Sequence, residues 1–308
     1  MSFSAEVKNE LCRSEVERGC CALGEALGVL LFSNTFTAEE VRIVTESVDF
    51  AQRLPKLFRR SFGVTFDSLP TENGGGKLHF SIHDGEKLER IFEHCGFSRS
   101  NSLSLHVNFA LLEKDCCRRA FLRGAFLAGG SVTDPEKRYH LELSTTHYNA
   151  GREAENLLGD MELTPKLTER KGSHVLYFKQ SETIETVLTA MGAPICAMAV
   201  MEAKINKNWR NIANRKTNCD SANLDKTVAA AGEQIAAICK LRDLGILEDL
   251  PEKLRQTAAL REEYPEENLV ELGQLHAPPI SKSAVNHRIR KLMQLAKGTE
   301  EPREESLL

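Results

Sequence analysis

The sequence is poor in the features that mark several classes of protein. Aromatic residues make up 6% of its 308 residues, and tryptophan occurs once, at Trp209. Its apolar runs all fall short of the roughly 18 residues that a transmembrane helix requires. The N-terminus also lacks the basic and apolar regions of a signal peptide. We therefore expect a cytoplasmic protein with no membrane segment.

No strong overall charge marks the chain either. The formal net charge is −4, and the hydrophobic and charged fractions, 41% and 27%, are those of an ordinary soluble globular protein. Any surface that attracts a polyanion must therefore be local. The length fits two domains or one large domain.

Cysteine occurs nine times, an odd number that favours a reduced protein. Cys20-Cys21 and Cys116-Cys117 are adjacent pairs, whereas zinc fingers space their cysteines as Cys-x-x-Cys with histidines at a fixed distance. We interpret these cysteines as structural thiols and expect no metal site; a metal site is the weaker alternative.

Signatures of catalysis and cofactor binding are also missing. Gly74-Gly75-Gly76 lacks the Lys-Ser/Thr that completes a phosphate-binding loop. The histidines His79, His83, His140 and His147 fall on different predicted strands or at their ends, so they do not suggest a catalytic triad. We expect no catalytic residue and no cofactor.

An internal repeat is the main positive feature of the sequence. The cysteine pairs are 96 residues apart, and so are Gly28 and Gly124, each in the middle of an apolar helical segment. Two apolar helices with glycines at matching places can cross with their backbones close together. The repeat therefore predicts a pair of helices packed at the centre of a pseudo-twofold domain.

The segments after each central helix also match. Both halves predict the order αββαββα, which makes the domain an α+β unit repeated once. The predicted strands and helices are residues 40–47, 50–62, 64–69 and 78–83 in the first half and 139–146, 149–161, 165–170 and 174–179 in the second, with a turn over Asn73–Gly76.

The segment Leu122–Gly130 resembles the LAGLIDADG helix of homing endonucleases without its acids. In that family the last acid of each helix binds the divalent metal that cleaves DNA. Ser33 and Gly129 occupy these two positions here, and the earlier acid is replaced by Leu31 and Leu127. The resemblance implies the scaffold without the metal chemistry. An active endonuclease is the alternative that we least expect.

A basic segment follows the repeat. Residues 204–219 contain five cations and no acid, and two interpretations are open: a solvated linker, or an arm that contacts DNA phosphates and releases counterions. The five residues are Lys204, Lys207, Arg210, Arg215 and Lys216.

The C-terminal part predicts a helix-turn-helix. Residues 268–275 form the supporting helix, 276–279 the turn and 280–292 the recognition helix, with Ser281 well suited to cap it. From Leu272 to Thr299 the sequence has no acidic residue. The order of elements and the local basic charge favour DNA recognition, whereas a basic helix in a bundle is the structural alternative.

The recognition helix has one apolar and one polar face. Val285, Ile289 and Leu292 are spaced for burial. The other side carries residue types that can hydrogen-bond to base edges. Arg288 and Lys291 are expected to contact phosphates. The pattern resembles the DNA-reading domain of sigma factors, although Pro278-Pro279 lengthens the turn. The base-facing set is Lys282, Ser283, Asn286, His287 and Arg290, and Ser281 at the cap is also expected to contact DNA.

The degenerate repeat, the junction Asn214–Asp220 and the helix-turn-helix together resemble the WhiA family over nearly the whole chain. The resemblance implies a bacterial transcription regulator bound to double-stranded DNA, associated with the nucleoid, and acting in cell division, chromosome segregation and sporulation. The expected parts are a LAGLIDADG-like domain, 1–205 (repeats about 1–112 and 113–205), a basic linker, 206–221, a helical domain, 222–298, and an acidic tail, 299–308.

The sequence leaves open what the saddle binds and what the oligomeric state is. The strands outside the central helices form what we call the saddle, and their mixed charge permits either DNA or a partner protein there. The internal repeat already supplies the pseudo-symmetry that dimeric relatives obtain by pairing, so we expect a monomer.

Overall fold

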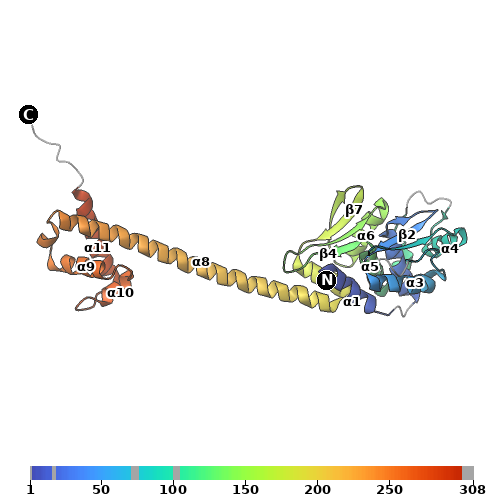
Figure 1. Cartoon of the computed structure of the whole chain (residues 1–308), viewed down its shortest axis with the longest axis horizontal. Helices are drawn as coiled ribbons and strands as arrows, with labels where there is room; N and C mark the ends of the chain where they lie inside the picture. The colour runs from blue at the N-terminus through green and yellow to red at the C-terminus, as the bar shows by residue number, and fades with distance from the viewer. Residues whose placement is uncertain (1, 16–18, 71–75, 100–104, 300–308) are drawn as a thin grey trace, which may run out of the picture. The chain divides into compact units, whose positions relative to one another are not determined.

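The computed structural model describes residues 2–15, 19–70, 76–99 and 105–299. The chain divides into two units, residues 1–209 and 210–308, which we call unit 1 and unit 2 and describe separately (Figure 1). Most of the predicted turn Asn73–Gly76 and nearly all of the acidic tail 299–308 lie outside the described residues.

Two helices with matching glycines form the centre of unit 1, as the repeat predicts. They are α2 (Gly19–Leu31) and α5 (Asp115–Gly129). A Cβ atom on Gly28 would lie 2.1 Å from the carbonyl oxygen of Phe121, and one on Gly124 would lie 2.0 Å from that of Glu25. Neither position has room for a side chain, so the two glycines set how closely the helices approach.

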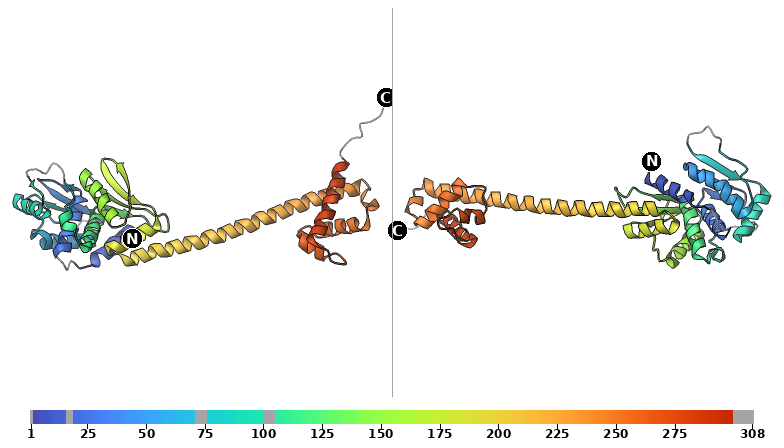
Figure 2. Two further views of the ribbon diagram at one scale, coloured as in Figure 1. Left: turned by 180° about the vertical axis from the view of Figure 1, so that it is seen from behind. Right: turned by 90° about the horizontal axis from the view of Figure 1, so that it is seen from below.

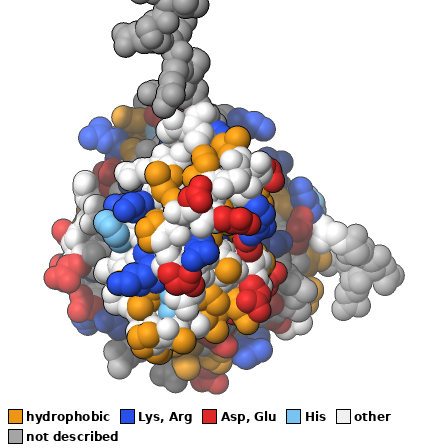
Figure 3. Space-filling view, turned by 90° about the vertical axis from the view of Figure 1, so that its left-hand side faces the viewer, with side chains coloured by type: hydrophobic (Ala, Val, Ile, Leu, Met, Phe, Trp, Pro, Cys, Tyr) orange, Lys and Arg blue, Asp and Glu red, His pale blue; other side chains and the backbone are white. Residues whose placement is uncertain are grey.

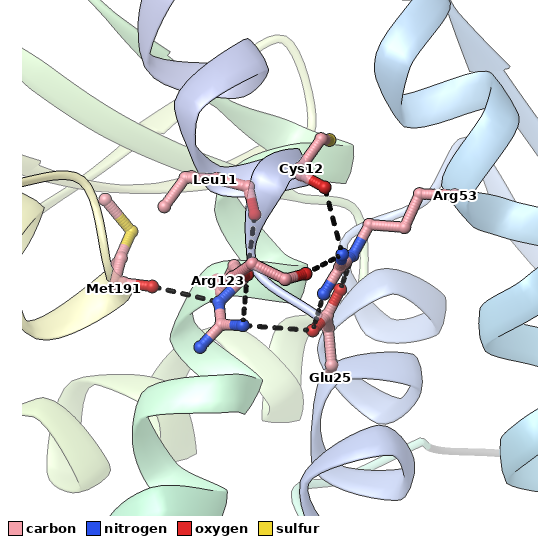
Figure 4. Close-up of polar contacts among 7 residues, drawn as sticks. Leu11, Cys12, Glu25, Arg53, Arg123 and Met191 are labelled. Atoms are coloured by element: carbon pink, nitrogen blue, oxygen red, sulfur yellow. Dashed lines mark hydrogen bonds and ion pairs between the residues drawn. The ribbon is translucent and has the colours of Figure 1, made fainter. Parts of the chain in front are cut away.

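A buried ion pair joins these helices to the elements around them (Figure 4). Glu25 on α2 accepts hydrogen bonds of 2.6 and 2.9 Å from Arg53 on α3 (Val48–Phe62). Arg123 on α5 approaches the same carboxylate at 3.6 Å and donates to the Met191 carbonyl at 2.9 Å. One carboxylate therefore links residues of both repeats.

The first repeat forms a three-stranded antiparallel sheet in the order β1-β2-β3. Its elements are α1 (Phe3–Arg13), α2, β1 (Thr35–Phe36), β2 (Val41–Thr45), α3, β3 (Leu78–Ile82) and α4 (Gly85–Cys95). The strand predicted over 64–69 is wrong, since only an isolated bridge between Ser68 and Ser81 forms there. The carboxylate of Asp67 accepts hydrogen bonds from the backbone amides of His83 and Asp84, and these replace a regular ladder.

The second repeat has the predicted order of elements, with a four-stranded antiparallel sheet ordered β4-β5-β7-β6. After the short 3-10 helix η2 (Phe109–Leu112) and α5 come β4 (Gly130–Val132), β5 (Leu141–Thr145), α6 (Tyr148–Asp160), β6 (Lys166–Arg170), β7 (Ser173–Phe178) and α7 (Ser181–Met191). The fold is thus the α+β duplicated unit that the sequence predicts (Figure 2).

Burial in the sheets follows the two-residue period of a strand. In β5, Leu141, Leu143 and Thr145 are buried, whereas Glu142 and Ser144 are partly exposed on the other face. The buried face packs on the helices in one hydrophobic core that includes Phe126 and Leu127 of α5. The outer face of the strands is left to form the saddle.

Unit 2 is helical. It contains the later part of α8 (Pro194–Asp243), the short 3-10 helix η3 (Leu247–Asp249), α9 (Glu252–Glu263), α10 (Leu269–Gln274) and α11 (Lys282–Gly298). The basic segment 206–221 lies inside α8 and is helical throughout. A separate core that includes Leu241, Leu272 and Ile289 holds this unit together.

Candidate nucleic-acid interface

The supporting helix α10 begins with a complete capping box. The Asn268 side chain accepts from the backbone amides of Val270 and Glu271, and the Glu271 carboxylate accepts from the Asn268 amide. This arrangement satisfies amides that a helix start leaves without partners. It explains why a helix of six residues forms at the predicted place.

The turn between α10 and α11 is fixed by a buried histidine. His276 is 3% exposed, and its ring nitrogens lie 2.9 Å from the Thr257 hydroxyl and 2.9 Å from the Leu272 carbonyl. The Ile280 amide donates to the Gly273 carbonyl at 3.0 Å. A Cβ on Gly273 would lie 2.5 Å from the Ile280 carbonyl oxygen. The turn therefore positions α11 against α10 and α9.

The recognition helix starts where its cap predicts. The Ser281 hydroxyl accepts from the Ala284 amide at 3.3 Å, which confirms the predicted cap and places the first helical residue at Lys282 rather than Ile280. The helix continues to Gly298, six residues beyond the predicted end. The cap fixes which residues stand at the exposed start of α11.

The two faces of α11 are those that its sequence predicts. Val285, Ile289 and Leu292 are buried in the core of unit 2. Lys282, Ser283, His287, Arg290 and Lys291 are exposed, as is Ser281 at the cap, whereas Asn286 is half-buried. Basic and acidic side chains are interspersed on the face of the molecule that Figure 3 shows. The sequence of α11 itself carries no acid.

Arg288 differs from the predicted set. Its guanidinium donates to the Lys253 carbonyl and the Thr257 hydroxyl, both at 3.3 Å, and the side chain is half-buried. These bonds direct it toward α9, because residue 288 lies between the buried and exposed faces of α11. We therefore treat Arg288 as a residue that holds the helix-turn-helix together.

Two of the five predicted cations in the basic segment have other partners in unit 1. Lys204 donates to the Glu182 carboxylate at 2.6 Å, and this contact raises the pKa of Lys204 and lowers that of Glu182 to about 2. Lys207 donates to the Pro135 carbonyl at 2.6 Å and lies 4.4 Å from the Tyr139 ring centre. The charges of both lysines are engaged within the fold, so we leave them out of the proposed contacts.

The other three cations of the segment lie further along α8. Arg210, Arg215 and Lys216 are exposed. Arg215 and Lys216 are adjacent in a continuous helix, so their side chains leave it in directions about 100° apart. A phosphate backbone running along one side of the helix would therefore not meet both side chains equally.

The two positions where the nuclease motif has its metal-binding acids, Ser33 and Gly129, do not suit an acid in this structure. Ser33 is buried, and its hydroxyl donates to the Leu30 carbonyl at 2.8 Å. A Cβ on Gly129 would lie 2.3 Å from the Ser144 carbonyl oxygen and 2.8 Å from that of Phe32. The backbone around Gly129 thus leaves no room for an acid. Among the described residues, the one group of His, Cys, Asp or Glu close enough to share a metal consists of cysteines.

Charges on the saddle pair with one another. On the outer face of the second sheet, the carboxylate of Glu142 lies 3.1 Å from His140 and 3.9 Å from Arg170. A carboxylate at this place repels phosphate, so this surface is less suited to a duplex than α11 is.

The two cysteine pairs, expected from sequence to be separate structural thiols, meet in the folded chain. The sulfur atoms of Cys20, Cys21, Cys116 and Cys117 all lie within 4.8 Å of one another, at the starts of α2 and α5. Each pair taken alone lacks a metal-binding spacing. The 96-residue offset already aligned the two cysteine pairs in sequence, and helices that cross at the matched glycines bring the pairs at their starts together.

Comparison with known families matches both units. The family model for the WhiA LAGLIDADG-like domain matches residues 118–210, and that for the WhiA C-terminal HTH domain matches residues 213–296. A protein of Ruminiclostridium cellulolyticum named probable cell division protein WhiA is 39% identical over 304 residues, covering 96% of this chain and 97% of the relative. One of the same name from Alkaliphilus oremlandii is 38% identical and covers 98% of both chains.

A solved structure shows the same fold over both units. The crystal structure of full-length WhiA from Thermatoga maritima aligns with a TM-score of 0.59 at 22% identity, covering 97% of this chain and 99% of that one. The fold is that of a LAGLIDADG-like domain, here without the acids of the nuclease motif, joined to a helix-turn-helix domain. On the family models and the full-length relatives, the chain belongs to the WhiA family. No helix among the described residues is both long and apolar enough to cross a membrane.

Proposed function

We propose that the protein is a sequence-specific DNA-binding regulator that reads double-stranded DNA through α11. The observation that carries the proposal is the first half of α11, where Lys282, Ser283 and Arg290 are exposed while the apolar stripe of the same helix is buried. A helix docks in the major groove with its N-terminal residues at the base edges. Serine, lysine and arginine there are donors that suit the N7 and O6 acceptors of guanine, while the half-buried Asn286 suits adenine.

We further propose that α8 adds affinity without sequence preference. Arg215 and Lys216 are exposed in a stretch that carries no acid from Ala203 to Cys219. Cations in such a stretch bind phosphates and release counterions, and this term depends steeply on salt. In this scheme α11 selects the site and the exposed cations of α8 strengthen binding to any duplex.

We infer the cellular role from the names of the relatives. Proteins that are 38–39% identical to nearly the whole chain are named probable cell division protein WhiA. We propose that this chain acts in cell division as a transcription regulator associated with the nucleoid. The roles in chromosome segregation and sporulation rest on the family resemblance alone, and a monomer remains our expectation for the oligomeric state.

We do not propose nuclease activity. Ser33 and Gly129 supply no carboxylate, and the Gly129 backbone contacts leave no room for one. A metal shared between the two repeats would therefore lack the charged oxygen ligands that it needs. The paired charges of the saddle instead support a partner protein as the second candidate for that surface.

Selection from a pool of random duplexes with the full-length chain tests the proposal. We expect one enriched motif, and we expect the Arg290→Ala chain to lose the preference at one base position while retaining weak binding. Arg255→Ala is a matched control, because Arg255 is exposed in the same unit and pairs with Glu252. No enrichment with the wild-type chain would overturn sequence-specific recognition and leave the partner-protein role.

A further inference from the structure

The two repeats bring four cysteines to one point at the head of the central helix pair. Cys20 and Cys21 lie in the first turn of α2, and Cys116 and Cys117 lie in the first turn of α5. All four sulfur atoms lie within 4.8 Å of one another. Cys21 contacts Cys116, and Cys20 contacts Cys117. These two contacts are equivalent under the 96-residue repeat, so the cluster has the pseudo-twofold symmetry of the domain.

The spacing of the sulfurs suits a single tetrahedral ion. Zinc binds thiolate sulfur at about 2.3 Å, which places the four sulfurs of a tetrahedron roughly 3.8 Å apart. Cys116 and Cys117 already lie 3.9 Å apart, and the longest separation in the cluster is at most 4.8 Å. Shifts of about 1 Å or less in the sulfur separations would bring them to the tetrahedral value. An iron–sulfur cluster would hold its thiolates farther apart, because its own atoms lie between them.

We propose that these four cysteines bind one zinc ion, which links the two repeats at the start of the central helices. The thiol set is the one that selects zinc among the common divalent ions. Zinc binding takes the proton from each of the four thiols and releases it to solvent, giving a tetrathiolate complex with a net charge of −2. The proposal concerns unit 1 and is independent of the DNA-reading role of α11.

The surroundings favour the negative charge of such a complex. Both pairs stand at helix N-termini, where backbone amides carry partial positive charge and stabilise thiolates. The guanidinium of Arg123 is close enough to Cys21 to interact with it electrostatically. Among the described residues, the groups within range to share a metal here are the four thiols alone.

Without an ion, four neighbouring thiols resist ionisation. Burial and hydrogen bonds among the thiols raise the pKa of Cys21 to about 11 and that of Cys117 to about 12. A divalent cation reverses this preference, because it compensates the thiolate charges directly. Cys20 is exposed and Cys117 is buried, so the cluster has one side open to solvent for entry of the ion.

Metal analysis of the full-length chain tests the proposal. Protein purified with reductant and without added metal is expected to contain one zinc per chain. After removal of zinc, cobalt(II) is expected to produce the visible bands and the sulfur-to-metal charge-transfer absorption of tetrahedral thiolate coordination. Cys20→Ser combined with Cys116→Ser is expected to abolish both signals. Cys219→Ser combined with Cys239→Ser is the matched control, because both thiols are exposed on unit 2.

The single variant Cys20→Ser keeps the test valid if the double variant fails to fold, because the Cys20 side chain is exposed. It is expected to keep the circular dichroism of the wild type and to bind zinc at least tenfold more weakly. Wild-type protein with neither zinc nor a cobalt spectrum would overturn the proposal. So would a metal content that the double cysteine variant retains. Thiol titration showing two thiols lost reversibly to oxidation, with no metal bound, would assign the cluster to a disulfide instead.

Discussion

Glu25 on α2 and Arg53 on α3 form a two-point ion pair at 2.6 and 2.9 Å, with side chains 2% and 6% exposed. Arg53 also donates to the backbone carbonyls of Cys12, in the last turn of α1, and of Ser14, its C-cap. The pair thus fixes the chain that leaves α1 to the central helix. The same Glu25 carboxylate lies 3.6 Å from the half-buried guanidinium of Arg123, so it faces two arginines.

Glu25→Gln is expected to destabilise unit 1 by about 3–5 kcal/mol, because it leaves buried arginine charge without a partner. Denaturant unfolding followed by circular dichroism measures the change. Glu40→Gln is the control, since Glu40 lies 4.0 Å from an exposed arginine and should cost less than about 1 kcal/mol. Equal effects of the two substitutions would mean that the buried pair contributes no more than a surface one.

Gly28→Ala is expected to destabilise unit 1 by at least about 1–3 kcal/mol, the usual range for overpacking. The added methyl would meet the Phe121 carbonyl at 2.1 Å, so the central helices must separate. Gly159→Ala in α6 has nothing within 4 Å and is expected to be neutral or up to about 1 kcal/mol stabilising. The comparison of the two unfolding midpoints checks this, and a tolerated Gly28→Ala would contradict the close crossing.

Restoring acids to the motif is not expected to restore cleavage. In a chain with Ser33→Asp and Gly129→Asp, the second aspartate would collide with the Ser144 and Phe32 carbonyls, so we expect lost stability and no magnesium-dependent nicking of plasmid DNA. A folded variant that nicks DNA above a matched Arg290→Ala, Arg215→Ala preparation would show that the scaffold still holds catalytic geometry.

Arg215→Ala is expected to weaken binding to all duplexes alike and to lower the dependence of log K on log salt by about one unit. Lys207→Ala is its matched control and should leave the salt dependence unchanged, because Lys207 is held by the Pro135 carbonyl and the Tyr139 ring. Binding isotherms at several salt concentrations measure both. A change of slope for Lys207→Ala with none for Arg215→Ala would reverse our assignment of the basic segment.

Much of the fold follows from local patterns in the sequence. The equal offsets of Gly28 and Gly124 predict the crossing of α2 and α5, and the alternation of residue types over Tyr139–Thr146 predicts β5. The Ser281 cap and the apolar spacing of Val285 and Ile289 predict the two faces of α11. Each of these signals depends on residues within one element or on a repeat visible in the chain.

The missed features depend on contacts between distant residues. In sequence, Lys204 and Lys207 carry the same charge as Arg215, but Glu182 and Pro135 come close to them only in the folded chain. The same holds for Arg288, whose partners are on α9. The strand predicted over 64–69 is replaced by side-chain hydrogen bonds of Asp67, which alternation cannot reveal.

Genome-wide DNA occupancy of the full-length chain, compared with a chain carrying Ser283→Ala and Arg290→Ala, tests the central claim most directly. Both side chains are exposed on α11, so the substitutions leave the core of unit 2 intact. We predict sharp peaks with the wild-type chain that share one motif and disappear in the double variant at equal protein level. Peaks that keep their positions and heights in the variant would contradict the claim that α11 reads the DNA sequence.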